Sequence, residues 1–331
     1  MPSNIVLVTG VSGELGGRLL SRLGACPGLD RIVGVDISPP SRGVLRQLGR
    51  LSRVEFVRAD IRNPLLAKIM TSAKVDTVVH VGPLCHPAGY GERADVKEAN
   101  VIGTMRLLAA CQNSPYVRKL VVASTTAVYG ASSRSQAVFT EDAELIPAVA
   151  SGYSKDAVEL EGYVRGFARR RPDVGVTTLR FADIVAGDLD TVFSRYFSLP
   201  LVPTVLGFDA RLQFLHAEDA LTVLEQATTE EKPGVFNVAG DGVLTLSQAI
   251  RRAGRIALPV PRPVMTPVGK VLRGAHAVNV SADLVRLLNF GRVVDTTRLV
   301  REFGYSPRWT TRQAFDEAVR TATSWRGRLR R

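Results

Sequence analysis

The chain has 331 residues, of which 45% are hydrophobic and 22% charged, the composition of a globular protein with a large core. No apolar run reaches the roughly 18 residues that predict a transmembrane helix, and no secretory signal pattern is expected at the start. Three scattered cysteines, Cys26, Cys85 and Cys111, predict neither a disulfide framework nor a metal site, so we expect a cytoplasmic protein.

The formal net charge of +12 comes mostly from arginine, with clusters at 169–171 and 251–252 and a basic tail over 326–331. Such clusters can attract nucleic acid, anionic lipid or acidic partners. No nucleic-acid-binding motif accompanies them, and no aromatic residues interleave with them. Nucleic acid is therefore not an expected partner, and a solvated, arginine-rich surface is the simpler interpretation.

Short apolar runs alternate with helical stretches through the first 180 residues. The runs are nearly continuous and β-branched, as in parallel strands that are buried on both faces. The alternation predicts an α/β fold with a doubly wound, Rossmann-like parallel sheet. Strands are expected at 4–9, 31–36, 53–59, 76–81, 119–124 and 175–180, and helices at 14–25, 41–50, 64–72, 93–113 and 151–171.

The alternation ends after residue 182. Prolines punctuate the rest of the chain, where we expect helices at 216–228 and 246–254 and a strand at 235–240 that returns to the sheet.

A glycine-rich loop follows the first strand and opens the first helix. Residues 8–20 read VTGVSGELGGRLL, and their GxxGxxG pattern permits a tight turn at the positive end of the helix. Backbone N–H groups there can approach a pyrophosphate, so the loop predicts dinucleotide binding; a merely glycine-rich turn is the alternative. The candidate contacts are Gly10, Ser12, Gly13, Glu14, Leu15 and Gly16.

Asp36 ends the second strand about 20 residues beyond the loop, where a carboxylate binds ribose hydroxyls. A carboxylate repels a 2′-phosphate, so we expect NAD rather than NADP as the cofactor. Arg42 lies close enough in the sequence to keep NADP as the alternative.

The TGxxGxxG form of the loop resembles the short-chain dehydrogenase/reductase superfamily. Other stretches are similar to its extended members, the NAD-dependent epimerase/dehydratase family typified by UDP-glucose 4-epimerase. The matches cover nearly the whole chain in the family's order. They are ADIRNP (59–64), VVHVG (78–82), EANVIGTMRLLAAC (98–111), STTAVYG (124–130), GYSK (152–155), LRFADIVAG (179–187), LQFLHAEDAL (212–221), FNVAG (236–240) and DTTRLVREFGYSP (295–307).

The resemblance implies an NAD-binding domain over 1–182, to which part of 216–240 returns, and a smaller α+β substrate-binding region over 183–325. It also implies a homodimer through the helices at 93–113 and 151–171.

Further cofactor contacts follow from the same resemblance. Asp60 and Ile61 would hold the adenine, Val81 and Gly82 would line the cofactor, and Asn100 would support the site. From the residues alone, Asp60 could instead cap a turn and Asn100 could be a satisfied buried polar group.

In this family a tyrosine transfers the substrate's hydroxyl proton while hydride moves to or from nicotinamide. A lysine four residues later lowers the tyrosine pKa, and a serine or threonine orients the substrate oxygen. The resemblance assigns Thr125 and Lys155 to the last two roles, with a strand-end residue and an exposed helical lysine as the alternatives. Ser151 stands in the place of the tyrosine.

Tyr153 lies two residues before Lys155, about 200° away around a helix, so it is expected to face elsewhere. Ser151 has the right position but a less acidic hydroxyl. His86 lies on the loop after the fourth strand and titrates near neutrality, although it could be an ordinary loop histidine. His80 and His216 are expected to be structural.

Two positions differ from the family on the substrate side. Asp183 replaces an asparagine that helps bind sugar nucleotides, and its charge opposes a diphosphate. Leu212 replaces a phosphate-binding arginine, while Arg211 would face the other way in an extended strand. A sugar-nucleotide substrate is therefore not favoured.

We thus expect an NAD-dependent oxidoreductase or epimerase-type enzyme that acts on a small molecule with a non-standard acid/base group. The alternatives are a catalytically silent NAD-binding protein, and a non-redox isomerase or lyase, or a sugar-nucleotide epimerase, in the same cleft.

Overall fold

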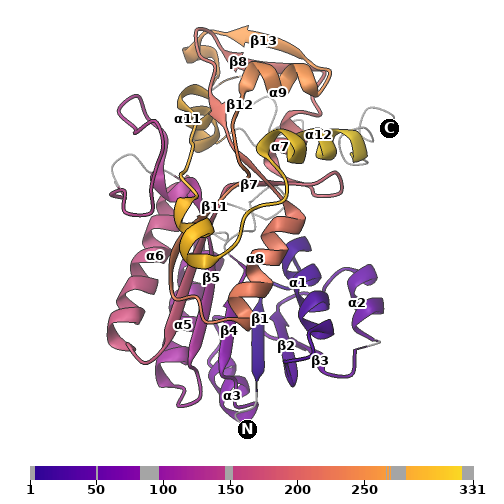
Figure 1. Cartoon of the computed structure of the whole chain (residues 1–331), viewed down its shortest axis with the longest axis vertical. Helices are drawn as coiled ribbons and strands as arrows, with labels where there is room; N and C mark the ends of the chain where they lie inside the picture. Colours follow the sequence, from indigo (N-terminus) through magenta and orange to yellow (C-terminus); the bar gives the residue numbers. More distant parts are fainter. Residues whose placement is uncertain are drawn as a thin grey trace. The chain divides into compact units, whose positions relative to one another are not determined.

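The computed structural model describes residues 4–49, 51–82, 97–145, 152–265, 267, 269 and 281–322 (Figure 1). The chain forms two compact units. Unit 1 comprises residues 1–125, 159–180 and 221–236, and unit 2 comprises residues 126–158, 181–220 and 237–331. That one region binds NAD and the other binds the substrate remains a prediction.

A seven-stranded sheet with the order β11-β6-β5-β4-β1-β2-β3 confirms the predicted Rossmann-like architecture. The chain runs from β1 through β2 to β3 on one side and then from β4 through β5 to β6 on the other, which is the order of a doubly wound sheet. Its register pairs Leu7 of β1 with Val33 of β2 and Val78 of β4. The strands are β1 (Ile5–Thr9), β2 (Arg31–Asp36), β3 (Val54–Arg58), β4 (Thr77–His80), β5 (Lys119–Thr125), β6 (Gly175–Phe181) and β11 (Gly234–Val238).

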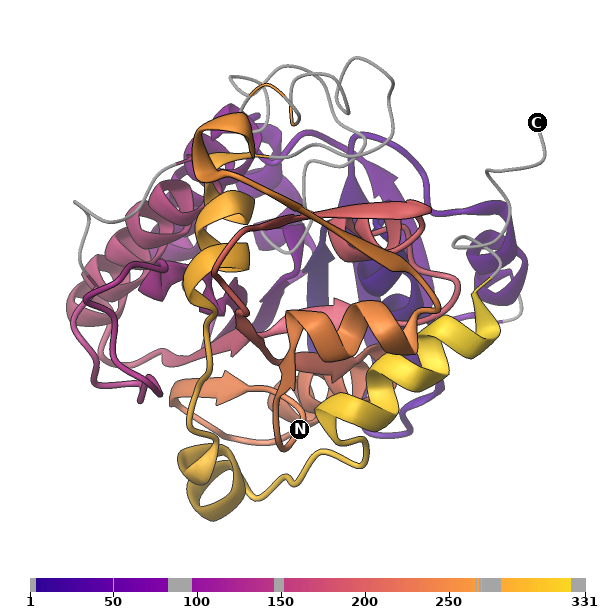
Figure 2. The same cartoon turned by 90° about the horizontal axis from the view of Figure 1, so that it is seen from above.

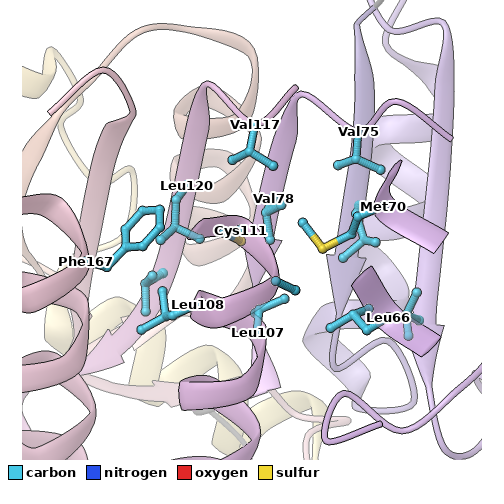
Figure 3. Packing of buried hydrophobic residues seen from close by; sticks show 14 of the residues in the cluster. Leu66, Met70, Val75, Val78, Leu107, Leu108, Cys111, Val117, Leu120 and Phe167 are labelled. Atoms are coloured by element: carbon cyan, nitrogen blue, oxygen red, sulfur yellow. The ribbon is translucent and has the colours of Figure 1, made fainter. Parts of the chain in front are cut away.

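One face of the sheet packs against three helices, α3 (Leu65–Ser72), α5 (Gly103–Asn113) and α6 (Gly152–Arg170). Their buried aliphatic side chains and Phe167 meet the strand residues that point to this side (Figure 3). The other face receives α1 (Glu14–Ala25), because Gly34 of β2 leaves room there for the side chain of Leu20. α2 (Arg42–Leu48) connects β2 with β3.

The helix expected at 93–113 is described from residue 97, and this part contains a feature that the periodicity did not predict. Residues Glu98–Ile102 form a π-helical turn that leads directly into α5. The hydroxyl of Thr104 donates to the carbonyl of Asn100 in this turn. Gly103 faces the side chain of Ile61, where an added Cβ would lie 2.6 Å from Ile61 Cδ1, so α5 approaches the end of β3 closely.

The described part of unit 2 contains three small two-stranded sheets. β7 (Asp183–Val185) pairs in parallel with β10 (Phe214–His216), and β9 (Arg211–Leu212) pairs antiparallel with β12 (Leu244–Thr245). β8 (Leu201–Val205) pairs in parallel with β13 (Ile256–Val260).

Further helical segments belong to unit 2. They are α7 (Val192–Tyr196), the start of α8 (Ala217–Thr229), α9 (Leu246–Arg252), α11 (Ala282–Phe290), a π-helical turn at Leu299–Phe303 and α12 (Thr311–Thr321), which Figure 2 shows beside α9. Phe193, Phe197, Phe214 and Phe315 form an aromatic cluster with stacked, edge-to-face and tilted contacts. The expected helices at 216–228 and 246–254 and the strand at 235–240 are confirmed as α8, α9 and β11.

Among the described residues, no helix is both long and apolar enough to cross a membrane.

Candidate cofactor and catalytic site

The glycine loop of unit 1 is tightly closed. Gly10 has φ +81°, which favours glycine, and an added Cβ there would lie 2.5 Å from the backbone nitrogen of Gly82. A Cβ on Gly16 would lie 2.1 Å from the carbonyl oxygen of Gly10. Only hydrogen fits at either position. The loop therefore passes directly over the start of α1 and beside Val81 and Gly82, which were expected near the cofactor.

The start of α1 has backbone donors that suit an anion. Gly13 is its N-cap residue and supplies no side-chain cap. The first N–H groups of a helix lack intrahelical partners and carry partial positive charge. Backbone N–H groups near Glu14, Leu15 and Gly16 can therefore meet a pyrophosphate, so the residues present fit a dinucleotide.

Asp36 is tied to this loop. Its Oδ2 accepts hydrogen bonds from the backbone N–H of Ser12 (2.9 Å) and from the Ser12 hydroxyl (2.7 Å), and its Oδ1 accepts from the N–H of Ile37 (2.7 Å). The carboxylate at the end of β2 is thus held in one orientation beside the phosphate loop. A ribose hydroxyl at this place would donate to a pre-positioned acceptor.

Asp60 makes both a turn and an ion pair. Its Oδ1 accepts from the backbone N–H of Arg62 at 2.8 Å, and the Arg62 guanidinium donates to both carboxylate oxygens. These hydrogen bonds hold the pKa of Asp60 below its usual value. The turn-cap interpretation therefore describes the Asp60 side chain here, and adenine contact by Asp60 and Ile61 remains a prediction.

His80 joins three elements beneath the site. It is buried, and its Nδ1 lies 2.7 Å from the Thr9 hydroxyl while its Nε2 lies 2.8 Å from the Thr104 hydroxyl. The Thr104 hydroxyl donates to Asn100, so it must accept from His80, which places the imidazole proton on Nε2. Burial lowers the pKa of His80 to about 4. The expected structural role of His80 is confirmed, and Asn100 contributes its carbonyl to the same chain of hydrogen bonds.

The predicted catalytic residues fall in different parts of the chain. Thr125 ends β5 and is partly buried in unit 1, whereas Lys155 is exposed in the first turn of α6 and belongs to unit 2. Tyr153 is partly buried in the same turn. Ser151 and His86 lie outside the described residues, so their roles stay predictions.

Unit 2 contains a charged group that the sequence reasoning missed. The Arg292 side chain is only 8% exposed; its Nε donates to the hydroxyl of Thr126 at 3.1 Å, and its guanidinium lies 3.6 Å from Asp183 Oδ2. Burial lowers the pKa of Arg292, and Asp183, Asp283 and Tyr153 oppose that shift. Burial also raises the pKa of Asp183.

The Arg292 group joins segments that are far apart in the sequence. Asp183 departs from a family pattern, but no sequence pattern around Arg292 identifies Arg292 as the partner of Asp183. Leu212 is buried while Arg211 is exposed and donates to the carbonyl of Ala137, as the alternation of an extended strand predicts.

Solved structures share the fold. A dTDP-glucose 4,6-dehydratase from Bacillus anthracis in complex with NAD superposes with a TM-score of 0.73 at 19% identity, over 96% of each chain. A UDP-glucuronic acid 4-epimerase from Bacillus cereus in complex with UDP-glucuronic acid and NAD also gives a TM-score of 0.73 at 19% identity, over 96% of this chain and 98% of the epimerase.

A closer relative in sequence is the uncharacterized protein Rv0501 of Mycobacterium tuberculosis. It is 48% identical over 316 residues, which are 96% of this chain and 83% of the relative. The model of the NAD-dependent epimerase/dehydratase family matches residues 6–239, a stretch that includes the phosphate loop, Asp36 and the first turn of α6. The chain therefore belongs to the NAD-dependent epimerase/dehydratase family, whose members are enzymes that use NAD.

Proposed function

We propose that the protein is an NAD-dependent oxidoreductase or epimerase-type enzyme that acts on the hydroxyl or carbonyl group of a small molecule. The observation that carries this proposal is the phosphate loop, closed by Gly10 and Gly16 and joined to Asp36 through Ser12. NAD supplies a hydride carrier when it is bound. The protein's own residues bind the cofactor, orient the substrate and move the proton.

The proton-transfer group departs from the family pattern. Thr125 would orient the substrate oxygen and Lys155 would contact the cofactor ribose, but Ser151 stands where the tyrosine belongs. Tyr153 is close enough to Arg292 for its charge to act on the pKa of that guanidinium. A cation near a phenol favours the phenolate, so Tyr153 is a rival to Ser151 and His86 as the acid/base group.

The charges around Arg292 support an uncharged substrate. Asp183 and Asp283 both act on this single guanidinium, so the group as a whole does not attract anions. Asp183 accepts and Arg292 donates hydrogen bonds, which suits hydroxyl groups better than a diphosphate. The B. cereus epimerase with UDP-glucuronic acid keeps a sugar nucleotide as the alternative substrate class.

The first experiment tests cofactor binding. NAD and NADP would be titrated calorimetrically into the full chain, its Gly16→Ala variant and a Gly28→Ala control, since no atom lies within 4 Å of an added Cβ at Gly28. We expect wild-type protein to bind NAD more tightly than NADP. Backbone strain of about 1–3 kcal/mol corresponds to a loss of roughly 5- to 150-fold in the affinity of Gly16→Ala. Equal binding by both variants would remove the basis of the proposal.

The second experiment tests turnover. The NAD-loaded protein would be incubated with polyols, hydroxy acids, ketones and sugar nucleotides while reduced cofactor and products are both followed, because an epimerase returns its hydride. Ser151→Ala, Tyr153→Phe and His86→Gln then identify the acid/base group, whose loss is expected to cost about 10²–10⁴-fold in rate.

The outcomes separate the alternatives. Tight NAD binding with no product from the whole panel would support the silent NAD-binding protein instead. Activity that appears only in Ser151→Tyr would point to an ancestral site that has lost its tyrosine. Conversion of only the sugar nucleotides would favour the epimerase alternative and contradict the charge argument at Asp183.

A further inference from the structure

A long part of unit 2 carries positive charge alone. Between Asp241 and Asp283 the sequence has no acidic residue but six cations, Arg251, Arg252, Arg255, Arg262, Lys270 and Arg273. These equal half of the formal net charge of +12. Lys270 and Arg273 lie outside the described residues, and Arg252 forms an ion pair with Asp316 at 2.6 Å. A ligand of this region is expected to be anionic.

The same part of the chain exposes an aliphatic strand. Residues 256–259 of β13 are all exposed, with Ile256 at 66% and Leu258 at 42%. Ile256 pairs with Leu201 of β8, which is 50% exposed, and Leu206 follows β8 with its N–H bonded to Val260. Within the described residues β8 is the sole sheet partner of β13, and Figure 1 shows β13 as the outer strand of this pair.

Arginines flank this strand at both ends. Arg251 lies in the last turn of α9, before β13, and Arg262 follows two residues after β13; both are exposed. We call Leu201, Leu206, Ile256, Leu258, Arg251 and Arg262 the β13 surface. Exposed aliphatic side chains bordered by arginines are the composition of surfaces that lie in a membrane interface, with the apolar groups inserted and the cations at the phosphates.

We propose that the β13 surface binds the headgroup region of an anionic lipid membrane. This proposal goes beyond the proposed enzymatic function and does not depend on it. Nucleic acid fits less well, because the surface has no aromatic ring on which a base could stack, and its aliphatic side chains make no hydrogen bonds to bases. A second copy of the chain fits less well because it would bring arginines of like charge together.

The test is co-sedimentation of the full chain with phosphatidylcholine vesicles, with and without phosphatidylglycerol. We expect binding only to the anionic vesicles, with weakening as salt is raised. Arg251→Gln/Arg262→Gln is expected to reduce partitioning by roughly 30-fold, since each basic residue near the surface contributes about fivefold. Ile256→Glu/Leu258→Glu is expected to abolish it.

A matched control carries the same two new charges elsewhere. Leu65→Glu/Val300→Glu replaces aliphatic residues that are 48% and 45% exposed, and it should bind like the wild type. All variants would first be compared by thermal unfolding. If Ile256→Glu/Leu258→Glu is unfolded, Arg251→Gln/Arg262→Gln still tests the proposal.

Several results would overturn the proposal. They are no binding to anionic vesicles, equal binding to phosphatidylcholine alone, and equal loss in the control variant. Dimers that dissociate on Ile256→Glu/Leu258→Glu would assign the surface to a second copy. Variant-sensitive binding to duplex DNA without vesicle binding would assign it to nucleic acid.

Discussion

His80 shows how one proton can hold several parts of a site together. Its neutral ring accepts from Thr9 at the end of β1 and donates to Thr104 of α5. Protonation would replace the acceptor at Nδ1 with a second donor, which would face a hydroxyl that could no longer donate to it. The strand before the phosphate loop and the helix after the π-helical turn therefore depend on a deprotonated imidazole.

For this reason the free energy of unfolding is expected to decrease as the pH is lowered. The pKa of His80 is about 4 when folded against 6.5 for a free histidine, so its contribution is complete above 6.5 and is lost as pH falls toward 4. Between pH 7 and pH 5 the loss is roughly 2 kcal/mol. Denaturant unfolding at both pH values would show a smaller pH dependence in His80→Gln than in the wild type, by about this amount. The same pH dependence of the free energy of unfolding in both proteins would contradict this prediction.

At the scale of elements, a buried ion pair fastens α6 to the sheet. Glu161 accepts from the hydroxyl of Ser124 in β5 at 2.6 Å and from Arg180 in β6 at 2.7 and 3.0 Å. Both charged side chains are at least 96% buried. A buried charge that loses its partner is left without solvation, which is far more costly than the loss of an exposed pair.

Glu161→Ala is therefore expected to lower the free energy of unfolding by about 3–5 kcal/mol. Glu55→Ala serves as its control, because it breaks the ion pair with Arg31 (2.7 Å), whose side chains are 42% and 46% exposed, and should cost less than about 1 kcal/mol. Urea unfolding of both variants measures the difference. Similar losses in the two variants would mean that the buried pair is not what holds α6.

The regular elements of the sheet could be predicted because they follow from local patterns. The strand expected at 31–36 is β2, and the helix expected at 14–25 is α1, since short apolar runs and helical periodicity are properties of neighbouring residues. The glycine loop could be predicted for the same reason.

Contacts between distant segments could not be predicted in this way. Nothing local in the sequence pairs Glu161 with Arg180, or Asp183 with Arg292. β13 lies in a proline-rich stretch whose sequence does not predict a strand. It is a strand because it pairs with β8, which is distant in the sequence. Such contacts depend on how the whole unit packs, and the local periodicity of the sequence carries no information about that packing.

At the scale of the whole molecule, a homodimer through α5 and α6 remains a prediction. Gly162 on α6 has no atom within 4 Å of an added Cβ, so a side chain there meets open space within the protomer. Gly162→Arg should preserve the fold, because replacing a glycine inside a helix raises the free energy of unfolding by up to about 1 kcal/mol. It would, however, obstruct a helix packed against this position.

Light scattering coupled to size exclusion would measure the assembly. We expect a dimer for the wild type and for Gly28→Arg, which adds the same charge at another open position, and a monomer for Gly162→Arg. A wild-type monomer, or a dimer that tolerates Gly162→Arg, would rule out an interface at this part of α6.

The closeness of Gly16 to the carbonyl of Gly10 also bears on how this protein can evolve. Every amino acid that a single base change can put in place of glycine carries a Cβ carbon. No missense neighbour in the genetic code therefore fits at residue 16 without moving the loop. Even alanine, the smallest of these replacements, is expected to weaken cofactor binding roughly 5- to 150-fold in one mutational step.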